Sequence, residues 1–391
     1  MIYMGKQLKS KTEPYHFVIC PTVSCNLRCT YCFESDEQHK CFDLMSDGQL
    51  NTIFEYIKGY VDKYNEEKNS NKSNKPNVLL YGGEPLLKCN FSIVKRVLEF
   101  ARQTKIEAGI ITNATTIDDD YCKLLKEYKN EIRSIQVTMD GNKSIHDKRR
   151  IRADGSGTFD SICRGINKIL ELGIKVSLRI NTDAENIGYL GELKKVFKKQ
   201  GWLENSLFYP YVAPVQCHNC KKKSCNIITN SSILNNLIEN GFYGTKTSFL
   251  KNIISPVYSI VLNFFDTPGN KKKPWKYTYC GSAAGVEYCF SPNGTIATCL
   301  SCVGNRDYRI GTFDENSVNI EEDRLKMWTD RDRFKMANCK NCKFTFLCGG
   351  GCPLDALESN NDINKPICDD IENTLKVYVN HIKDKLLEMA K

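Results

Sequence analysis

Three cysteines near the N-terminus have a spacing suited to holding iron. Cys25, Cys29 and Cys32 follow a predicted strand as C-x3-C-x2-C, and no fourth ligand lies at a matching distance. Three thiolates can hold three irons of a [4Fe-4S] cube and leave the fourth iron open to a cofactor. A structural zinc site is the alternative, but such sites normally close with four ligands, and His39 and Cys41 lie outside the usual spacing.

An aromatic residue, Tyr31, directly precedes the third cysteine. With it, the run resembles the cysteine motif of the radical S-adenosylmethionine (SAM) superfamily. The resemblance implies that SAM binds the open iron and that one electron from the Cys25, Cys29 and Cys32 cluster cleaves it to a 5'-deoxyadenosyl radical. That radical abstracts hydrogen from a substrate carbon. The sequence assigns no further catalytic residue.

The elements that would position this loop alternate between short apolar runs and amphipathic helices, which is typical of an α/β protein with a parallel sheet. Strands are predicted at residues 16–20, 77–81, 108–112, 134–139, 175–181 and 207–212. Helices with an apolar period of 3.6 are predicted at residues 50–61, 159–170 and 190–197. We expect a partial (βα)6 TIM-like barrel, in which the C-terminal ends of the strands share one face.

Gly82, Gly83 and Glu84 end the second predicted strand. Glycines let backbone carbonyls approach a ligand closely, and a carboxylate attracts an ammonium group. Alone, this run is equally suited to a tight turn. One βα unit after the cysteine loop, it resembles the glycine-glycine-glutamate motif of the superfamily, which implies that Gly82, Gly83 and Glu84 receive the methionyl amine of SAM.

The third and fourth predicted strands end at Asn113 and Thr138. Both side chains can hydrogen-bond a ribose or a carboxylate, although both residue types are also common in turns. We predict that they contact SAM.

Residues 139–150 resemble the M-D-G-x4-H-x3-R run of radical SAM peptide and protein maturases. The resemblance implies that Arg150 meets the SAM carboxylate, and a planar guanidinium suits that group. Arg149 in this role, or a surface salt bridge, is the alternative. Arg179, in the fifth predicted strand, is a further candidate for SAM binding, and its alternative is an ion pair with Asp183 or Glu185.

A second set of cysteines fills the C-terminal third. It comprises Cys280, Cys299, Cys339, Cys342, Cys348, Cys352 and Cys368. The set resembles the SPASM domain, an extension of radical SAM enzymes with two auxiliary [4Fe-4S] clusters. The resemblance implies one cluster on Cys339, Cys342, Cys348 and Cys368, and the other on Cys280, Cys299 and Cys352. A pair of zinc sites is the alternative.

The fourth ligand of the cluster on Cys280 is open: either Cys289 completes it, or one iron stays free for substrate. Cys217, Cys220 and Cys225 match neither cluster pattern, and we predict no special role for them. The remaining cysteines are expected to be small buried side chains. They are Cys20, Cys41, Cys89, Cys122, Cys163 and Cys302.

Length and composition fit an enzyme of the cytoplasm. The chain has 391 residues, 41% of them apolar, and 20 cysteines. It carries no apolar run of the roughly 18 residues that a membrane span needs and no signal peptide, so we expect a cytoplasmic protein without membrane contact. In a reducing compartment, clustered thiols indicate metal ligands. We predict a radical SAM barrel over residues 12–235, a helical linker over 236–279 and a SPASM domain over 280–391.

Radical SAM enzymes with this extension mostly modify peptides or proteins, so the resemblance implies an oxidoreductase of the maturase type. The main prediction is a thioether or carbon-carbon cross-link in a ribosomally synthesised peptide. Conversion of a sulfatase Cys or Ser to formylglycine is the alternative. Sulfatase maturases carry an Asp after the cysteine that matches Cys299, whereas this chain has Leu300, which speaks against that reaction.

The expected partners are a precursor peptide or protein and an electron donor such as flavodoxin or ferredoxin. The net charge is +9, with lysine runs at 221–223 and 271–273 that would dock a leader peptide unless a separate leader-recognition protein does so. A zinc-bound nucleic-acid-binding protein is the hypothesis from another class. It predicts interleaved basic and aromatic residues, which the sequence lacks, so no nucleic acid is expected.

Overall fold

The structure is a computed structural model. It describes residues 14–32, 34, 43–67, 74–216, 226–243, 248–253, 257–258 and 278–389. The chain divides into two compact units. The first comprises Met1–Thr138, His146–Leu178 and Gly281–Asp330, and the second comprises Met139–Ile145, Arg179–Cys280 and Arg331–Lys391. These units are defined by contacts alone, and the predicted domain boundaries stay a prediction.

The first unit contains a mostly parallel sheet. Its parallel strands are β1 (His16–Ile19), β2 (Asn77–Leu80), β3 (Glu107–Thr112), β4 (Ile132–Thr138) and β8 (Glu287–Phe290). Antiparallel strands β9 (Thr295–Ala297), β10 (Gly311–Phe313) and β11 (Val318–Ile320) continue beyond β8. β1 therefore pairs with β2 on one side and with β8 on the other, so its C-terminal end lies inside the sheet.

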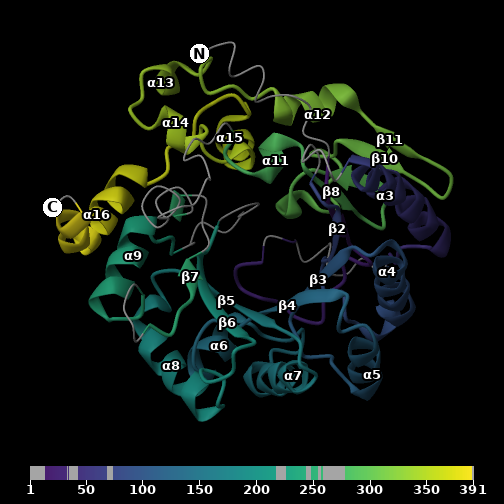
Figure 1. Cartoon of the computed structure of the whole chain (residues 1–391), viewed down its shortest axis with the longest axis horizontal. Helices are drawn as coiled ribbons and strands as arrows, with labels where there is room; N and C mark the ends of the chain where they lie inside the picture. The colour runs from purple at the N-terminus through teal and green to yellow at the C-terminus, as the bar shows by residue number, and fades with distance from the viewer. Residues whose placement is uncertain are drawn as a thin grey trace. The chain divides into compact units, whose positions relative to one another are not determined.

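The first unit also contains helices. They are α3 (Asp47–Glu67), α4 (Phe91–Thr104), α5 (Asp119–Glu127), α7 (Phe159–Glu171), α11 (Gly281–Ala284) and α12 (Glu322–Thr329), with short 3-10 turns η2 (Lys88–Asn90) and η4 (Leu300–Cys302). Figure 1 shows α4, α5 and α7 on the same face of strands β2 to β4. The apolar stripe of α7 explains its place, because Ile162, Ile166 and Ile169 are fully buried.

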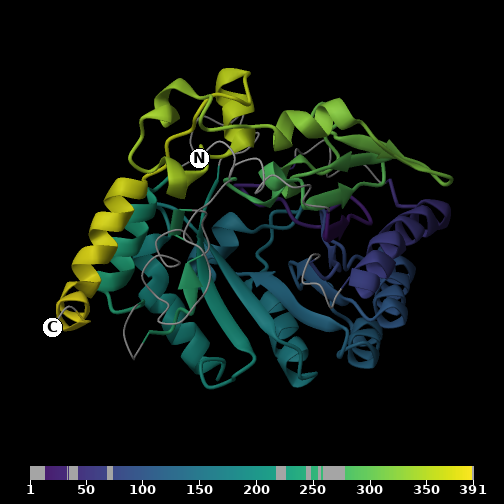
Figure 2. The same cartoon turned by 45° about the horizontal axis from the view of Figure 1, so that its top comes forward.

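The second unit includes the C-terminal part of β5 (Val176–Thr182), which the two units share. Its further elements are η3 (Ile187–Tyr189), α8 (Leu190–Lys199), β6 (Phe208–Pro214), α9 (Asn230–Glu239), β7 (Asn252–Ile253), α13 (Ala337–Lys340), α14 (Thr345–Cys348), α15 (Pro353–Asn360) and α16 (Ile371–Met389). α6 (Lys143–Arg149) spans the boundary between the units. α9 and α16 pack side by side, as Figure 2 shows. Phe197, Trp202 and Phe208 form an aromatic core beneath α8.

The predicted α/β class with a mostly parallel sheet is confirmed. All six predicted strands occur within two residues of their predicted ends, and the three predicted helices occur as α3, α7 and α8. The prediction missed strands β7 to β11. Among the described residues, no helix is both long and apolar enough to cross a membrane.

Candidate functional site

The cysteine loop directly follows β1 and is fastened to the segment after α6. Backbone hydrogen bonds join Arg28 N to Ile151 O at 2.7 Å and Thr30 N to Arg149 O at 2.9 Å. The Arg28 side chain also donates through Nη1 to the carbonyls of Cys25 and Leu27, both at 2.7 Å. The backbone that carries the three cysteines is therefore held by contacts that need no ligand.

The three thiols of this loop lie close enough to influence one another. Burial raises the pKa of Cys25 and Cys32 far above the usual thiol range, and the neighbouring thiols raise it further. Nearby carboxylates, Glu84 for Cys25 and Glu34 for Cys32, add to this effect. Such thiolates become stable only when a bound cation offsets their charge. An iron-sulfur core supplies that positive charge, so the donor set fits the predicted cluster.

The cysteine loop does not form a ready-made site for a single metal ion. No three His, Cys, Asp or Glu side chains among the described residues are arranged so that they could hold such an ion. A four-iron cube keeps its ligands farther apart than a single ion does. The sixteen cysteines in the described part of the chain carry thiols rather than disulfides.

Gly82 and Gly83 lie directly beneath the cysteine loop. Gly83 N donates to Thr22 O at 3.1 Å, and Glu84 N donates to Ser24 O at 2.9 Å. A Cβ atom on Gly83 would stand 2.2 Å from Ser24 O, and one on Gly82 would stand 2.5 Å from Thr22 O. The two glycines are therefore required for this close backbone approach, whatever their part in SAM binding, which stays a prediction.

Glu84 is 1% exposed and joins the ends of β2 and β3. Its Oε1 accepts from Leu86 N at 2.9 Å and from Thr112 Oγ1 at 2.6 Å, and its Oε2 accepts from Asn113 N at 2.6 Å. Burial raises the pKa of Glu84, while these hydrogen bonds and the charge of Arg150 oppose the rise. The carboxyl thus already has three protein donors, and its predicted contact with the SAM amine stays untested.

Asn113 connects β3 to the cysteine loop. Its Nδ2 donates to Asn26 Oδ1 at 2.8 Å and lies 4.0 Å from Cys25 Sγ. Its Oδ1 accepts from the backbone and hydroxyl of Thr115. The end of β4 carries Thr138, which is 7% exposed. The structure thus brings Asn113, Glu84 and Cys25 together.

Arg150 lies against Tyr31, the aromatic residue of the cysteine motif. Arg150 Nη1 donates to Tyr31 Oη at 2.6 Å, and Arg150 is 7% exposed. The guanidinium of Arg149 lies 5.1 Å from the centre of the Tyr31 ring. Both arginines therefore contact Tyr31, and the alternative of a surface salt bridge does not describe either buried side chain.

The other polar residues of the run 139–150 serve the fold. Asp147 Oδ1 accepts from Thr158 N and Phe159 N, both at 2.8 Å, and thereby caps the start of α7. Buried His146 bonds to Thr158 Oγ1 at 3.1 Å. In the second unit, buried Asp140 accepts from Asn181 N at 3.1 Å.

Arg179 belongs to the second unit. Its Nε donates to Asn181 Oδ1 at 2.6 Å, and it also bonds to Tyr211. Its contacts in the described part of the chain are thus neutral groups, rather than Asp183 or Glu185. Its predicted contact with SAM remains a prediction.

Four of the C-terminal cysteines gather in the second unit. Cys342, Cys348 and Cys368 all lie near enough to Cys339 to raise its pKa, after the larger effect of burial. These are the four residues predicted to hold one auxiliary cluster. The assignment of a cluster to these four cysteines stays a prediction.

The cysteines predicted for the other auxiliary cluster fall in both units. Cys280 and Cys352 belong to the second unit, and both raise the pKa of Tyr279 after burial and Asp369. Cys299 and Cys289 belong to the first unit, where Cys299 raises the pKa of fully buried Cys289 after burial and Glu287. Whether Cys289 is a ligand stays open.

Some predictions for the other cysteines need correction or lie outside the described residues. Cys89 was expected to be buried and is exposed, and Cys122 is only half-buried, because both lie at the surface of their helical segments. Cys20, Cys163 and Cys302 are buried as expected. The segment with Cys217, Cys220 and Cys225, the lysines at 221–223 and 271–273, and Cys41 lie outside the described residues.

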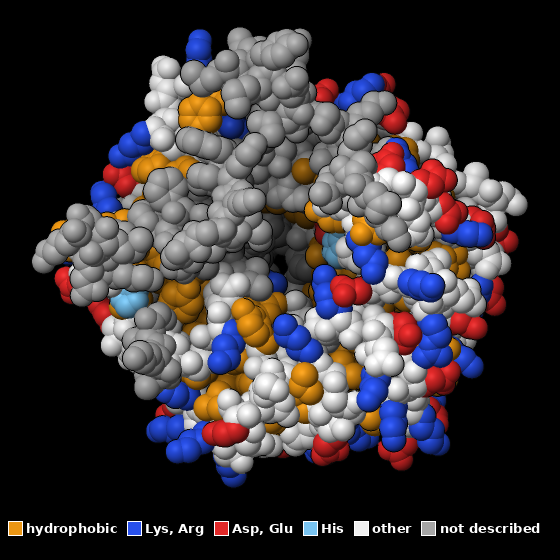
Figure 3. All heavy atoms as spheres, viewed as in Figure 1, with side chains coloured by type: hydrophobic (Ala, Val, Ile, Leu, Met, Phe, Trp, Pro, Cys, Tyr) orange, Lys and Arg blue, Asp and Glu red, His pale blue; other side chains and the backbone are white. Residues whose placement is uncertain are grey.

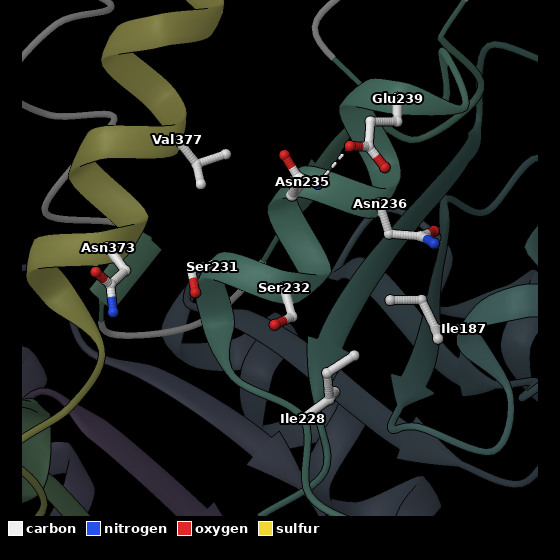
Figure 4. Close-up of a pocket in the computed structure, with 9 residues that line it drawn as sticks. All are labelled: Ile187, Ile228, Ser231, Ser232, Asn235, Asn236, Glu239, Asn373 and Val377. Carbon is white, nitrogen blue, oxygen red and sulfur yellow. Dashed lines mark hydrogen bonds between the residues drawn. The ribbon is translucent and has the colours of Figure 1, made fainter.

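A cleft of about 470 Å³ opens beside α9 and α16 in the second unit. Figure 4 shows its hydroxyl and amide lining, in which Asn235 donates to Glu239 at 2.6 Å. None of the residues predicted to bind a metal or a cofactor lines it. On the face drawn in Figure 3, basic and acidic side chains are interspersed over the described part of the surface.

Comparisons with known proteins find matches along most of this chain. Residues 19–194 match the family model of the radical SAM superfamily. A cysteine-type anaerobic sulfatase-maturating enzyme of Clostridium novyi is 26% identical over 344 residues, which cover 84% of this chain and 85% of that protein. A serine-type anaerobic sulfatase-maturating enzyme of Bacteroides thetaiotaomicron is 24% identical over 374 residues, covering 90% and 85%.

Solved structures show the same fold. The structure named "Native anSMEcpe with bound AdoMet" matches 96% of this chain and 99% of its own, with a TM-score of 0.69 and 19% identity. Streptococcus suis SuiB bound to precursor peptide SuiA matches 95% of this chain and 78% of its own, with a TM-score of 0.64 and 17% identity.

Proposed function

We propose that this chain, a radical SAM protein through residues 19–194, oxidises a Cys or Ser side chain of a peptide or protein, as sulfatase maturation requires. The observation that carries the proposal is the similarity to sulfatase-maturating enzymes along 84% of the chain, well beyond the matched radical SAM domain. The predicted cofactors are those of the family: SAM, one [4Fe-4S] cluster that binds it, and two auxiliary [4Fe-4S] clusters.

The reaction of a cysteine substrate balances as a two-electron oxidation. Bound SAM and its cluster together supply, when reduced by one electron, a radical that takes one hydrogen atom from the side-chain carbon. Loss of one further electron and one proton from the substrate would give a thioaldehyde, and an auxiliary cluster held by Cys339, Cys342, Cys348 and Cys368 could accept that electron. Water converts the thioaldehyde to the aldehyde and hydrogen sulfide. A serine substrate gives the same aldehyde without loss of sulfur.

The residues proposed for these tasks follow from the contacts described above. Cys25, Cys29 and Cys32 would hold the SAM-binding cluster. The pair of Tyr31 and Arg150 would orient SAM, since Arg150 offers a charged donor that is already fixed by the Tyr31 hydroxyl. Asn113 and Glu84 would support the loop, because Asn113 donates to Asn26 of the loop and Glu84 accepts from the Asn113 backbone.

A peptide cross-link is the second candidate function. One observation favours it: Leu300, which begins η4, stands where the sulfatase maturases have an Asp, so a proton acceptor of that kind is lacking at this position. Cross-linking needs two hydrogens removed but no water added. The likeness to SuiB supports only a shared fold.

The test is an anaerobic reaction of the full chain with SAM, dithionite and a synthetic peptide that contains one cysteine. We expect 5'-deoxyadenosine together with a peptide aldehyde, detected by mass spectrometry after labelling with a hydrazide. The matched control is Cys25→Ala/Cys29→Ala/Cys32→Ala, which should release 5'-deoxyadenosine only at background level.

The products separate the candidates. A peptide that has lost two hydrogens and does not react with hydrazide would favour cross-linking. No 5'-deoxyadenosine from a protein with full iron loading would contradict both. An electron donor such as flavodoxin or ferredoxin, a separate leader-recognition protein and a location in the cytoplasm remain part of the proposal.

A further inference from the structure

A buried arginine, Arg331, lies among the cysteines of the second unit. It is 5% exposed and donates hydrogen bonds to backbone carbonyls alone. Nε donates to Ile363 O at 2.6 Å, Nη1 to Gly351 O at 2.8 Å and Gly349 O at 3.4 Å, and Nη2 to Gly350 O at 2.7 Å and Lys365 O at 3.1 Å. Arg331 thereby joins the turn between Cys348 and Cys352 to the segment that leads to Cys368.

The turn is built for this contact. Gly349, Gly350 and Gly351 all have left-handed backbones, with φ values of 72°, 90° and 78°. A Cβ atom on Gly351 would stand 1.9 Å from Ile367 O, and one on Gly350 would stand 3.0 Å from Arg331 Nη1. Only glycine lets three successive residues adopt this conformation and approach so closely.

The same peptide groups also reach a predicted cluster ligand. The backbone N–H groups of Gly350 and Gly351 donate hydrogen bonds to the Cys348 sulfur. The N–H of Gly350 shares a peptide group with the carbonyl of Gly349, and the N–H of Gly351 shares one with the carbonyl of Gly350. Both carbonyls accept hydrogen bonds from Arg331. Each peptide group is thus polarised by a cation at its oxygen and donates to sulfur at its N–H, which strengthens both bonds.

The charge of Arg331 has no carboxylate partner among the described residues. Burial lowers its pKa, and the charges that raise it are those of Cys352, Cys280, Cys339 and Cys348. An uncompensated buried charge is costly, so a compensating negative charge is needed. Thiolates that ligate iron provide it. Cys280 and Cys352 are predicted for one auxiliary cluster, and Cys339 and Cys348 for the other.

We propose that Arg331 is the shared positioning residue and counter-charge of both auxiliary clusters, a role that rests on the cysteine assignments of the proposed function. Its guanidinium holds the glycine turn so that backbone N–H groups face the Cys348 sulfur. Its positive charge favours the reduced, more negative state of each cluster, because net charge and hydrogen bonds to sulfur set cluster potentials.

The test uses the full chain with Cys25→Ala/Cys29→Ala/Cys32→Ala, which leaves the auxiliary clusters as the iron centres. In this background we compare Arg331→Gln, which removes the charge, with Arg331→Lys, which keeps it without the forked donors. Lys343→Gln is the matched control, because Lys343 neighbours Cys342 but is exposed and paired with Glu372 at 2.9 Å. Iron and sulfide content and the midpoint potentials from electron paramagnetic resonance titration are measured.

For Arg331→Gln we expect at least a tenfold fall in the ratio of reduced to oxidised cluster at fixed potential, which equals 59 mV for a one-electron couple. Arg331→Lys should shift less, and Lys343→Gln should leave the potentials unchanged. If Arg331→Gln binds no cluster, retention of clusters by Arg331→Lys still supports the role of charge.

Two results would overturn the inference. One is normal loading of Arg331→Gln with wild-type potentials, and the other is equal loss of clusters from both Arg331 variants, which would make the role one of shape alone. Failure of the background protein itself to bind auxiliary clusters would instead reject the cysteine assignments on which the inference rests.

Discussion

Position 83 requires glycine, and the sequence and the structure give different reasons for it. The sequence suggests that a glycine here opens the backbone to SAM, whereas the structure shows the Ser24 carbonyl of the cysteine loop in the place of a side chain. The turn and the loop are therefore a single packed unit. The glycine would be needed even in the absence of a ligand.

This packing predicts opposite effects for two glycine substitutions. Gly83→Ala should lower the free energy of unfolding by about 1–3 kcal/mol, because its Cβ would stand 2.2 Å from Ser24 O and force the loop to move. Gly59→Ala is the control: Gly59 lies within α3 with nothing near its Cβ, so alanine should stabilise by about 0.5–1 kcal/mol.

Urea unfolding of both variants, followed by circular dichroism under anaerobic conditions, measures the two effects. Equal unfolding midpoints for Gly83→Ala and the wild type would show that the cysteine loop can move to accommodate the Cβ atom without a loss of stability. Reduced iron loading in Gly83→Ala alone would connect the strain to the cluster site.

The parallel strands β1 and β2 carry a histidine, His16, at the start of their pairing. His16 on β1 bonds through Nδ1 to Asn77 Oδ1 on β2, its partner in the strand register. Burial lowers the pKa of His16 below 6.5, and Arg133 lowers it further against the effect of Asn77. Glu287 Oε2 lies 3.5 Å from His16 Nε2. Burial, followed by the charge of Cys299, raises the pKa of Glu287 to about 8. That carboxyl is uncharged in the same range and does not hold the His16 proton.

This environment predicts a loss of stability in acid. The pKa of His16 is lower in the folded chain than in the unfolded chain, so the unfolded chain binds the proton more readily. The contribution of His16 to the free energy of unfolding is therefore complete above pH 6.5. It is lost as the pH falls from 6.5 through the pKa of the folded chain. His16→Gln should flatten this part of the pH profile. Urea unfolding above and below pH 6.5 measures the difference, and equal slopes for the variant and the wild type would exclude His16 as the cause.

The elements themselves show what could be predicted from sequence. The six strands β1 to β6 were predictable because each is a short apolar run before a helix or a polar turn. Strands β8 to β11 were not, since they are three or four residues long and depend on distant partners. The pairing of Phe17 on β1 with Tyr288 on β8 joins positions that no local pattern connects.

The candidate site was predictable only where local sequence motifs carry it. Cysteine spacing alone indicated the cluster loop. Tyr31 and Arg150 come from two different motifs, and the structure brings them into contact. The role of Arg331 carried no sequence signal. The role follows from hydrogen bonds to five carbonyls in residues 349–351 and 363–365, two segments that only the folded chain brings together.

We expect parts of the molecule to differ in how much their order depends on iron. Strands β2, β3 and β4 are joined by parallel backbone pairing, and their side chains form a buried core. The segment 331–368 instead contains three short helices: α13 and α14 have four residues each, and α15 has eight. Helices of this length are not stable by themselves, and this segment contains the buried charge of Arg331 together with four gathered thiols.

Removal of iron should therefore loosen one part of the molecule selectively. In the chelated protein we expect amide hydrogen exchange in residues 331–368 to become at least about tenfold faster, a change of about 1.4 kcal/mol in local stability, while β2 to β4 keep their protection. Metal binding supplies folding free energy where the ligands are otherwise unstructured, and the thiols repel one another once the metal is gone. Exchange measured by mass spectrometry on loaded and chelated protein tests this. The triple alanine variant of Cys25, Cys29 and Cys32 is the control, because its response in 331–368 should match the wild type. Equal exchange before and after chelation would mean that the segment is ordered by the chain alone.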